Sequence, residues 1–134
     1  EIDRVLSNLN VEASQRIQVI FITTDPERDT PERLTTWLGY FNSGFIGLTG
    51  SPKEIDKVLS SVGIAKPVKT DLGDGEYLVS HPSYIVAYTP DDLAHIVYPI
   101  LLKESGGFDT EGLYVMLIND LERLALYGWE DNLK

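Results

Sequence analysis

Apolar residues recur along the chain in patterns that predict four strands. The run IQVIFITT (17–24) is β-branched and almost continuously apolar, which is typical of a strand buried on both faces of a parallel sheet. FIGLT (45–49) predicts a second, short strand. Two further apolar runs, at 83–88 and 93–100, are separated by a turn containing proline and aspartate, and they predict an antiparallel hairpin.

Helical spacing of apolar residues predicts four helices, and two of them begin with clear capping residues. Residues 2–9 read as the end of an amphipathic helix, and residues 109–127 as a long final helix. The pair TP (30–31) is predicted to begin the helix after the first strand, with Gly44 at its end. SPKE (51–54) fits a capping box with proline at the first helical position.

The order of these elements predicts an α/β protein with a thioredoxin-like fold, in which helices flank a mixed β-sheet. Between the third helix and the hairpin lies a polar stretch (66–80) whose Asp74-Gly75 turn can join two short extended arms. Trp37 and Phe41, on the second helix, are predicted to lie in the core. We expect a single domain over residues 1–134 that is N-terminally incomplete, because the first central strand of such a sheet is missing from the given chain.

Composition narrows the classes of function. With 43% apolar and 24% charged residues, the 134-residue chain has the composition of a globular domain. The net charge of −10 argues against nucleic acid or an anionic membrane as the main partner. The residues given contain no cysteine, which excludes from them a disulfide, a thiolate metal ligand and a thiol nucleophile.

Three segments of the chain resemble the Sco/SenC family of thioredoxin-like copper chaperones. DPERDTPERL (25–34) and FIGLTGSPKEI (45–55) are close to the family pattern, and GEYLVSHPSYIVAYTPDD (75–92) is similar to its later segment, where a histidine precedes a hairpin strand. The resemblance implies a copper-binding assembly factor that delivers copper to the copper-bearing subunit of cytochrome c oxidase. It also implies an extracytoplasmic location (the periplasm, the outer face of the cell membrane or the mitochondrial intermembrane space), with an N-terminal membrane anchor that the given residues lack.

The resemblance also implies a copper site made of two cysteines in a CxxxC motif and one distant histidine. His81 matches that histidine by position, and the cysteines are expected shortly before Glu1. Thiolates select copper(I), and imidazole suits both oxidation states of copper. Asp25, Asp29, Tyr77 and Pro82 are expected to flank the site. The two aspartates also fit plain turn and cap chemistry, and Tyr77 also fits a packing role.

Two residues next to His81 depart from the family pattern. Ser80 stands where the family usually has an acid. Pro82 stands where thiol oxidoreductases keep a cis-proline, so we predict that the His81–Pro82 bond is cis. This proline favours an alternative function, that of a thiol–disulfide oxidoreductase. A third possibility is a cysteine-free relative that binds a partner protein and no metal. His95 is predicted to be a surface histidine.

Overall fold

The computed structural model describes residues 1–41, 44–100 and 102–129. These residues form two compact units. One consists of Gln18–Pro82, and the other of Glu1–Ile17 together with the described residues from Ser83 onward. None of the helices in these ranges combines the length and the apolar character needed to cross a membrane.

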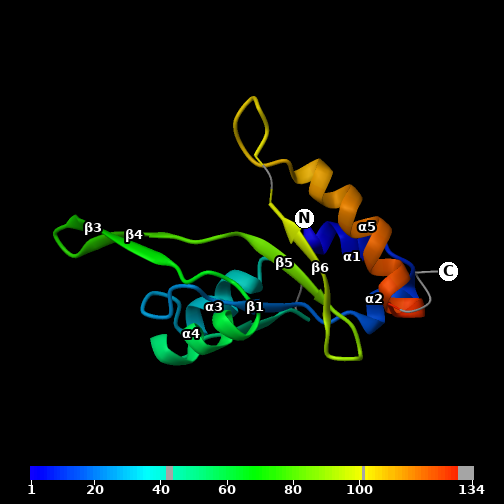
Figure 1. Cartoon of the computed structure of the whole chain (residues 1–134), viewed down its shortest axis with the longest axis horizontal. Coiled ribbons are helices and arrows are strands. Elements are labelled where there is room, and N and C mark those ends of the chain that lie inside the picture. Colours follow the sequence, from blue (N-terminus) through cyan, green and yellow to red (C-terminus); the bar gives the residue numbers. More distant parts are fainter. Residues whose placement is uncertain (42–43, 101, 130–134) are drawn as a thin grey trace. The chain divides into compact units, whose positions relative to one another are not determined.

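The unit Gln18–Pro82 is built on two short parallel strands with two helices (Figure 1). Strand β1 (Ile20–Ile22) pairs with β2 (Ile46–Leu48), and α3 (Pro31–Leu38) connects them before α4 (Pro52–Ser61) follows. Helix α3 lies close against β2, since a Cβ atom added to Gly47 would lie 2.8 Å from the Leu38 side chain. A glycine in this strand therefore allows the close approach of the helix.

The same unit contains the hairpin of β3 (Val68–Gly73) and β4 (Glu76–Ser80), which extends away from α3 and α4 (Figure 1). Asp74 and Gly75 join its strands with φ angles of 53° and 79°. Positive φ at both central residues is the requirement of a tight type I′ hairpin turn, which Asp-Gly meets at little cost. The predicted turn and its two extended arms are therefore confirmed.

The other unit packs three helices against a second hairpin. Helices α1 (Ile2–Asn8) and α2 (Val11–Arg16) contact α5 (Thr110–Tyr127), which also contacts β6 (Ala94–Pro99), the partner of β5 (Tyr84–Tyr88). Its core is an apolar cluster from α1, its C-cap, β6 and α5: Val5, Leu9, Tyr98, Leu113 and Leu117. The predicted hairpin and final helix are confirmed. Helix α2 was not predicted, because its N-cap Asn10 also suits a turn.

Three expectations about burial and length were wrong. The strand β1 is not buried on both faces, since Ile20 is 53% exposed. Trp37 and Phe41 are 43% and 49% exposed, and they stack edge to face with each other. Helix α3 ends at Leu38, well before Gly44. The described strands form three two-stranded sheets, one parallel and two antiparallel, so the class is α/β as predicted.

Candidate functional site

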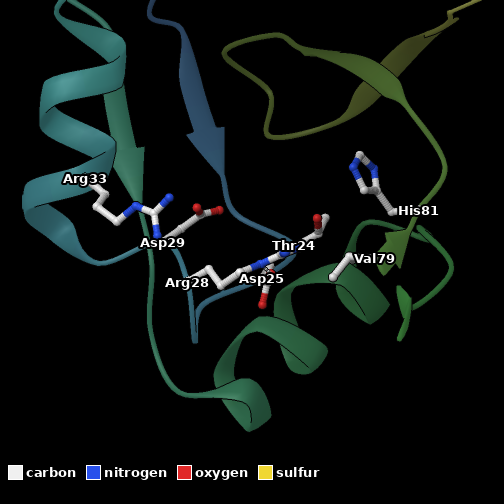
Figure 2. A pocket seen from close by; sticks show the side chains of 7 residues that line it. All are labelled: Thr24, Asp25, Arg28, Asp29, Arg33, Val79 and His81. Atoms are coloured by element: carbon white, nitrogen blue, oxygen red, sulfur yellow. Dashed lines mark hydrogen bonds and ion pairs between the residues drawn. The ribbon is translucent and has the colours of Figure 1, made fainter. Parts of the chain in front are cut away.

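A cavity of about 300 Å³ opens in the unit Gln18–Pro82, between the loop after β1 and the end of β4 (Figure 2). Its lining residues include Asp25, Arg28 and Asp29 from the loop, Arg33 from α3, and His81 directly after β4. The cavity therefore gathers three of the residues predicted from the sequence: Asp25, Asp29 and His81. Tyr77 is not a lining residue, but it bonds to Asp25 across 52 positions of the chain.

The loop between β1 and α3 is held in shape by its own hydrogen bonds. The Asp25 carbonyl accepts from the backbone N–H groups of Arg28 (3.1 Å) and Asp29 (2.9 Å). The Thr23 hydroxyl oxygen accepts from the Asp25 N–H (2.9 Å) and donates to the Asp29 carboxylate (2.5 Å). Thr30 then caps α3. Both aspartates thus stabilise the turn after β1, one of the two roles that the sequence allowed for them. The Asp25 carboxylate also binds residues outside the loop.

The buried Asp25 carboxylate lies at the centre of a polar cluster. The residue is 5% exposed, and both of its oxygens accept hydrogen bonds: one from Arg28 Nε and one, at 2.9 Å, from the Tyr77 hydroxyl. Lys69 Nζ lies 3.8 Å from the same carboxylate. Burial raises the pKa of Asp25, but the hydrogen bonds and the two cations outweigh burial and hold the pKa below its ordinary value. The carboxylate is therefore charged at neutral pH.

The His81 imidazole lies at the rim of the cavity, apart from the Asp25–Arg28 pair (Figure 2). Its Nδ1 is 3.1 Å from the carbonyl oxygen of Pro82. Because a carbonyl only accepts hydrogen bonds, Nδ1 is the donor in this contact, and in the neutral imidazole the lone pair is then on Nε2. Histidine ligands in metal sites commonly have this arrangement, with the far nitrogen facing the metal. The side chain is exposed and thus accessible to a ligand.

The His81–Pro82 peptide bond is trans, so the predicted cis bond was wrong. The trans form of an X-Pro bond is favoured by about 0.5–1 kcal/mol. The residues between β4 and β5 form no tight turn that would reverse this preference. The cis-proline, the feature that favoured a thiol–disulfide oxidoreductase, is therefore absent at Pro82.

Arg28 was not among the residues predicted from the sequence, although it contacts both Asp25 and Tyr77. Its guanidinium binds the Asp25 carboxylate, donates from Nη1 to the Tyr77 carbonyl (3.2 Å), and stacks on the Tyr77 ring with 4.4 Å to the ring centroid. The signal available in the sequence was the spacing of Asp25 and Arg28, three residues apart in a turn. That spacing permits an ion pair but does not reveal the partner on β4.

The described residues do not form a complete metal site by themselves. No group of three or more histidine, cysteine, aspartate or glutamate side chains in the described ranges is arranged to hold a metal ion. The Asp25 oxygens are occupied by Arg28 and Tyr77, and one Asp29 oxygen accepts from Thr23. His81 Nε2 fits a soft metal such as copper, but the other ligands of such a site have to come from outside these residues.

Comparison with known proteins places the chain in a family. The SCO1/SenC family model matches residues 1–104. A relative from Stutzerimonas stutzeri, named "Putative copper-binding protein", is 36% identical over 104 residues, which cover 76% of this chain and 50% of the relative. The chain thus spans about half the length of this curated relative.

Two solved structures share the fold. Apo Sco1 from Thermus thermophilus has a TM-score of 0.74 at 28% identity, covering 92% of this chain and 66% of that one. ScoI from Bradyrhizobium japonicum, solved with copper bound, has a TM-score of 0.69 at 31% identity, covering 91% of this chain and 70% of that one. The predicted thioredoxin-like α/β fold is therefore confirmed. The chain belongs to the SCO1/SenC family.

Proposed function

We propose that this protein is a copper-binding assembly factor that delivers copper to the dinuclear copper centre of cytochrome c oxidase. The observation that carries the proposal is the state of His81: an exposed imidazole at the rim of a cavity, with its Nδ1 bonded to a carbonyl and its Nε2 available. Family membership and the likeness to a ScoI structure with copper bound support copper as the metal.

In this proposal His81 is one of three copper ligands. The other two are the cysteines of the family's CxxxC motif, which the resemblance places before Glu1. Two thiolates and one imidazole form a soft ligand set that favours copper(I) over hard cations. Copper is then the cargo of the protein, and its transfer exchanges the chaperone's copper–ligand bonds for those of the oxidase subunit without breaking a covalent bond of either chain. The extracytoplasmic location remains a prediction from the family resemblance.

The proposal predicts that copper(I) affinity of the full-length protein depends on His81. Replacing the imidazole in His81→Ala removes one ligand, and we expect affinity to fall by at least about tenfold. Affinity is measured by titration of copper(I) in competition with a chromogenic chelator.

His95→Ala is the matched control, because it removes the chain's other histidine, whose Nε2 already lies 2.8 Å from the Asp91 carboxylate. Copper affinity should be unchanged in this variant. The same proteins are then tested for copper transfer to the apo form of the oxidase subunit. Unchanged copper(I) affinity in His81→Ala would contradict the proposed role of His81.

A further inference from the structure

Three side chains join the loop after β1 to the strand that leads to His81. Arg28 bonds at once to the Asp25 carboxylate and, from Nη1, to the Tyr77 carbonyl (3.2 Å). The Tyr77 hydroxyl closes the ring by donating to the other Asp25 oxygen (2.9 Å). We call this ring the Asp25–Arg28–Tyr77 clamp. Its hydrogen bonds hold both the side chain and the backbone of Tyr77, which restrains the position of β4 as well as the orientation of the tyrosine ring.

The strand that the clamp holds has little other support. All six residues of β3 are exposed, and β4 alternates between exposed and half-buried positions. A two-stranded hairpin of this kind is marginally stable by itself. Lys69 on β3 adds a second attachment to the loop, with its Nζ 2.7 Å from the Glu27 carboxylate. The position of the hairpin relative to the loop thus depends on a few polar contacts, of which the clamp is the most buried.

His81 follows Ser80, the last residue of β4, and so lies four residues beyond Tyr77. A strand is extended and stiff over this length, at about 3.3 Å per residue. A displacement of Tyr77 from the loop therefore moves the backbone that carries the imidazole. The cavity links the same parts, because Arg28 and His81 both line it.

We propose that the clamp positions His81 for copper, with Arg28 and Tyr77 as positioning residues that never touch the metal. Arg28 and Tyr77 act through the backbone of β4, and the buried Asp25 carboxylate holds both of them. The copper part of this inference rests on the proposed function, whereas the positioning of the imidazole can be measured without copper.

The first test compares two arginines that line the same cavity. Arg28→Gln breaks the clamp, whereas Arg33→Gln removes the same charge from a side chain that forms no hydrogen bond or ion pair with the other residues lining the cavity (Figure 2). Copper(I) affinity of the full-length protein should fall by about tenfold in Arg28→Gln, the usual effect of losing support behind a ligand. It should change by less than about twofold in Arg33→Gln. Equal losses in both variants would show a simple charge effect and overturn the clamp.

The second test follows the histidine rings by NMR in the metal-free protein. The chain has two histidines, so His95 in the other unit serves as an internal reference. We expect the His81 ring signals to shift or broaden in Arg28→Gln and in Tyr77→Phe, while the His95 ring signals stay in place. In Arg33→Gln, the ring signals of both histidines should stay in place. Unchanged His81 signals in both clamp variants would refute the positioning role.

Tyr77→Phe keeps the inference testable if Arg28→Gln does not fold, because it removes a single hydroxyl group. The two tests also separate this inference from the proposed function. If His81→Ala binds copper normally but the clamp variants disturb the His81 ring, the copper proposal fails and the positioning role stands. If His81→Ala loses copper and neither clamp variant changes the His81 ring or copper affinity, the copper proposal stands and the positioning role fails.

Discussion

At the scale of single residues, Asp25 shows how the surroundings of a carboxylate decide its charge. Burial alone would favour the neutral acid, yet donors from Arg28 and Tyr77 reach both oxygens and lower the pKa below the ordinary value of 3.8. A group whose pKa is lower in the folded state stabilises the fold above its unfolded pKa. That stabilisation is lost as the pH falls through the folded pKa.

We therefore predict that Asp25→Asn lowers the free energy of unfolding at pH 7 by about 1–2 kcal/mol, the range for hydrogen bonds to a charged group. The difference from the wild type should shrink as the pH falls below 3.8, where the native carboxylate becomes protonated. Urea unfolding at neutral and acidic pH measures both effects.

Asp56→Asn is the control for this prediction. Asp56 pairs with Lys66 at 2.5 Å, but both side chains are largely exposed (43% and 59%). Exposed ion pairs contribute about 0–1 kcal/mol, so the control should cost less than Asp25→Asn at pH 7. A loss in Asp25→Asn that is equally large at every pH would be inconsistent with a charged native carboxylate.

At the scale of elements, the starts of α3 and α4 were predicted from capping residues, whereas the end of α3 was not predicted. Helix α4 begins with a complete capping box: the Ser51 hydroxyl accepts from the Glu54 N–H, and the Glu54 carboxylate accepts from the Ser51 N–H (2.8 Å). These groups lie within four residues of each other, so the sequence predicted them. Helix α3 instead ends at Leu38, because Tyr40 and Phe41 bond to the carbonyls three residues before them and tighten the last turn.

Ser51→Ala should therefore destabilise the unit Gln18–Pro82 by about 1 kcal/mol, the usual cost of losing an N-cap. Ser60→Ala provides the matched control in the same helix. The Ser60 hydroxyl bonds back to the Asp56 carbonyl (2.7 Å), and alanine is the better helix former, so this variant should be neutral or slightly stabilising. Thermal unfolding followed by circular dichroism compares the two, and similar midpoints for both variants would argue against the capping box as a source of stability.

At the scale of the whole molecule, each compact unit contains one tryptophan. Trp37 belongs to Gln18–Pro82, where it packs edge to face with Phe21 at 4.8 Å between ring centroids. Trp129 belongs to the other unit, where it stacks on His95 at 4.5 Å. In a Trp129→Phe variant, the fluorescence of Trp37 reports on the unfolding of Gln18–Pro82. In a Trp37→Phe variant, the fluorescence of Trp129 reports on the unfolding of the other unit.

The prediction of a single domain over residues 1–134 requires both tryptophans to report one unfolding transition. Leu117 is fully buried in the core that contains α5, and Leu117→Ala should cost about 2–5 kcal/mol. In a single cooperative domain, this substitution shifts the fluorescence midpoints of both backgrounds together. A shift seen only through Trp129 would mean that the two units unfold independently.

The sequence by itself determined the features that depend on neighbouring residues. The caps of α3, α4 and α5 and the Asp74-Gly75 turn arise within about four positions, where the chain has few alternatives. The motifs in 25–34, 45–55 and 75–92 predicted the family, and the resemblance led to His81, Asp25 and Tyr77 as candidate residues.

The tertiary structure decided what depends on contacts far apart in the chain. Arg28 meets Tyr77 across 49 positions, and no spacing rule predicts that contact. The trans bond before Pro82 and the exposure of Trp37 were likewise decided by the surroundings of these residues. Local chemistry selects helices and turns because the interacting groups are already tethered. The clamp needs the loop and the hairpin to lie side by side, and no local rule specifies that arrangement.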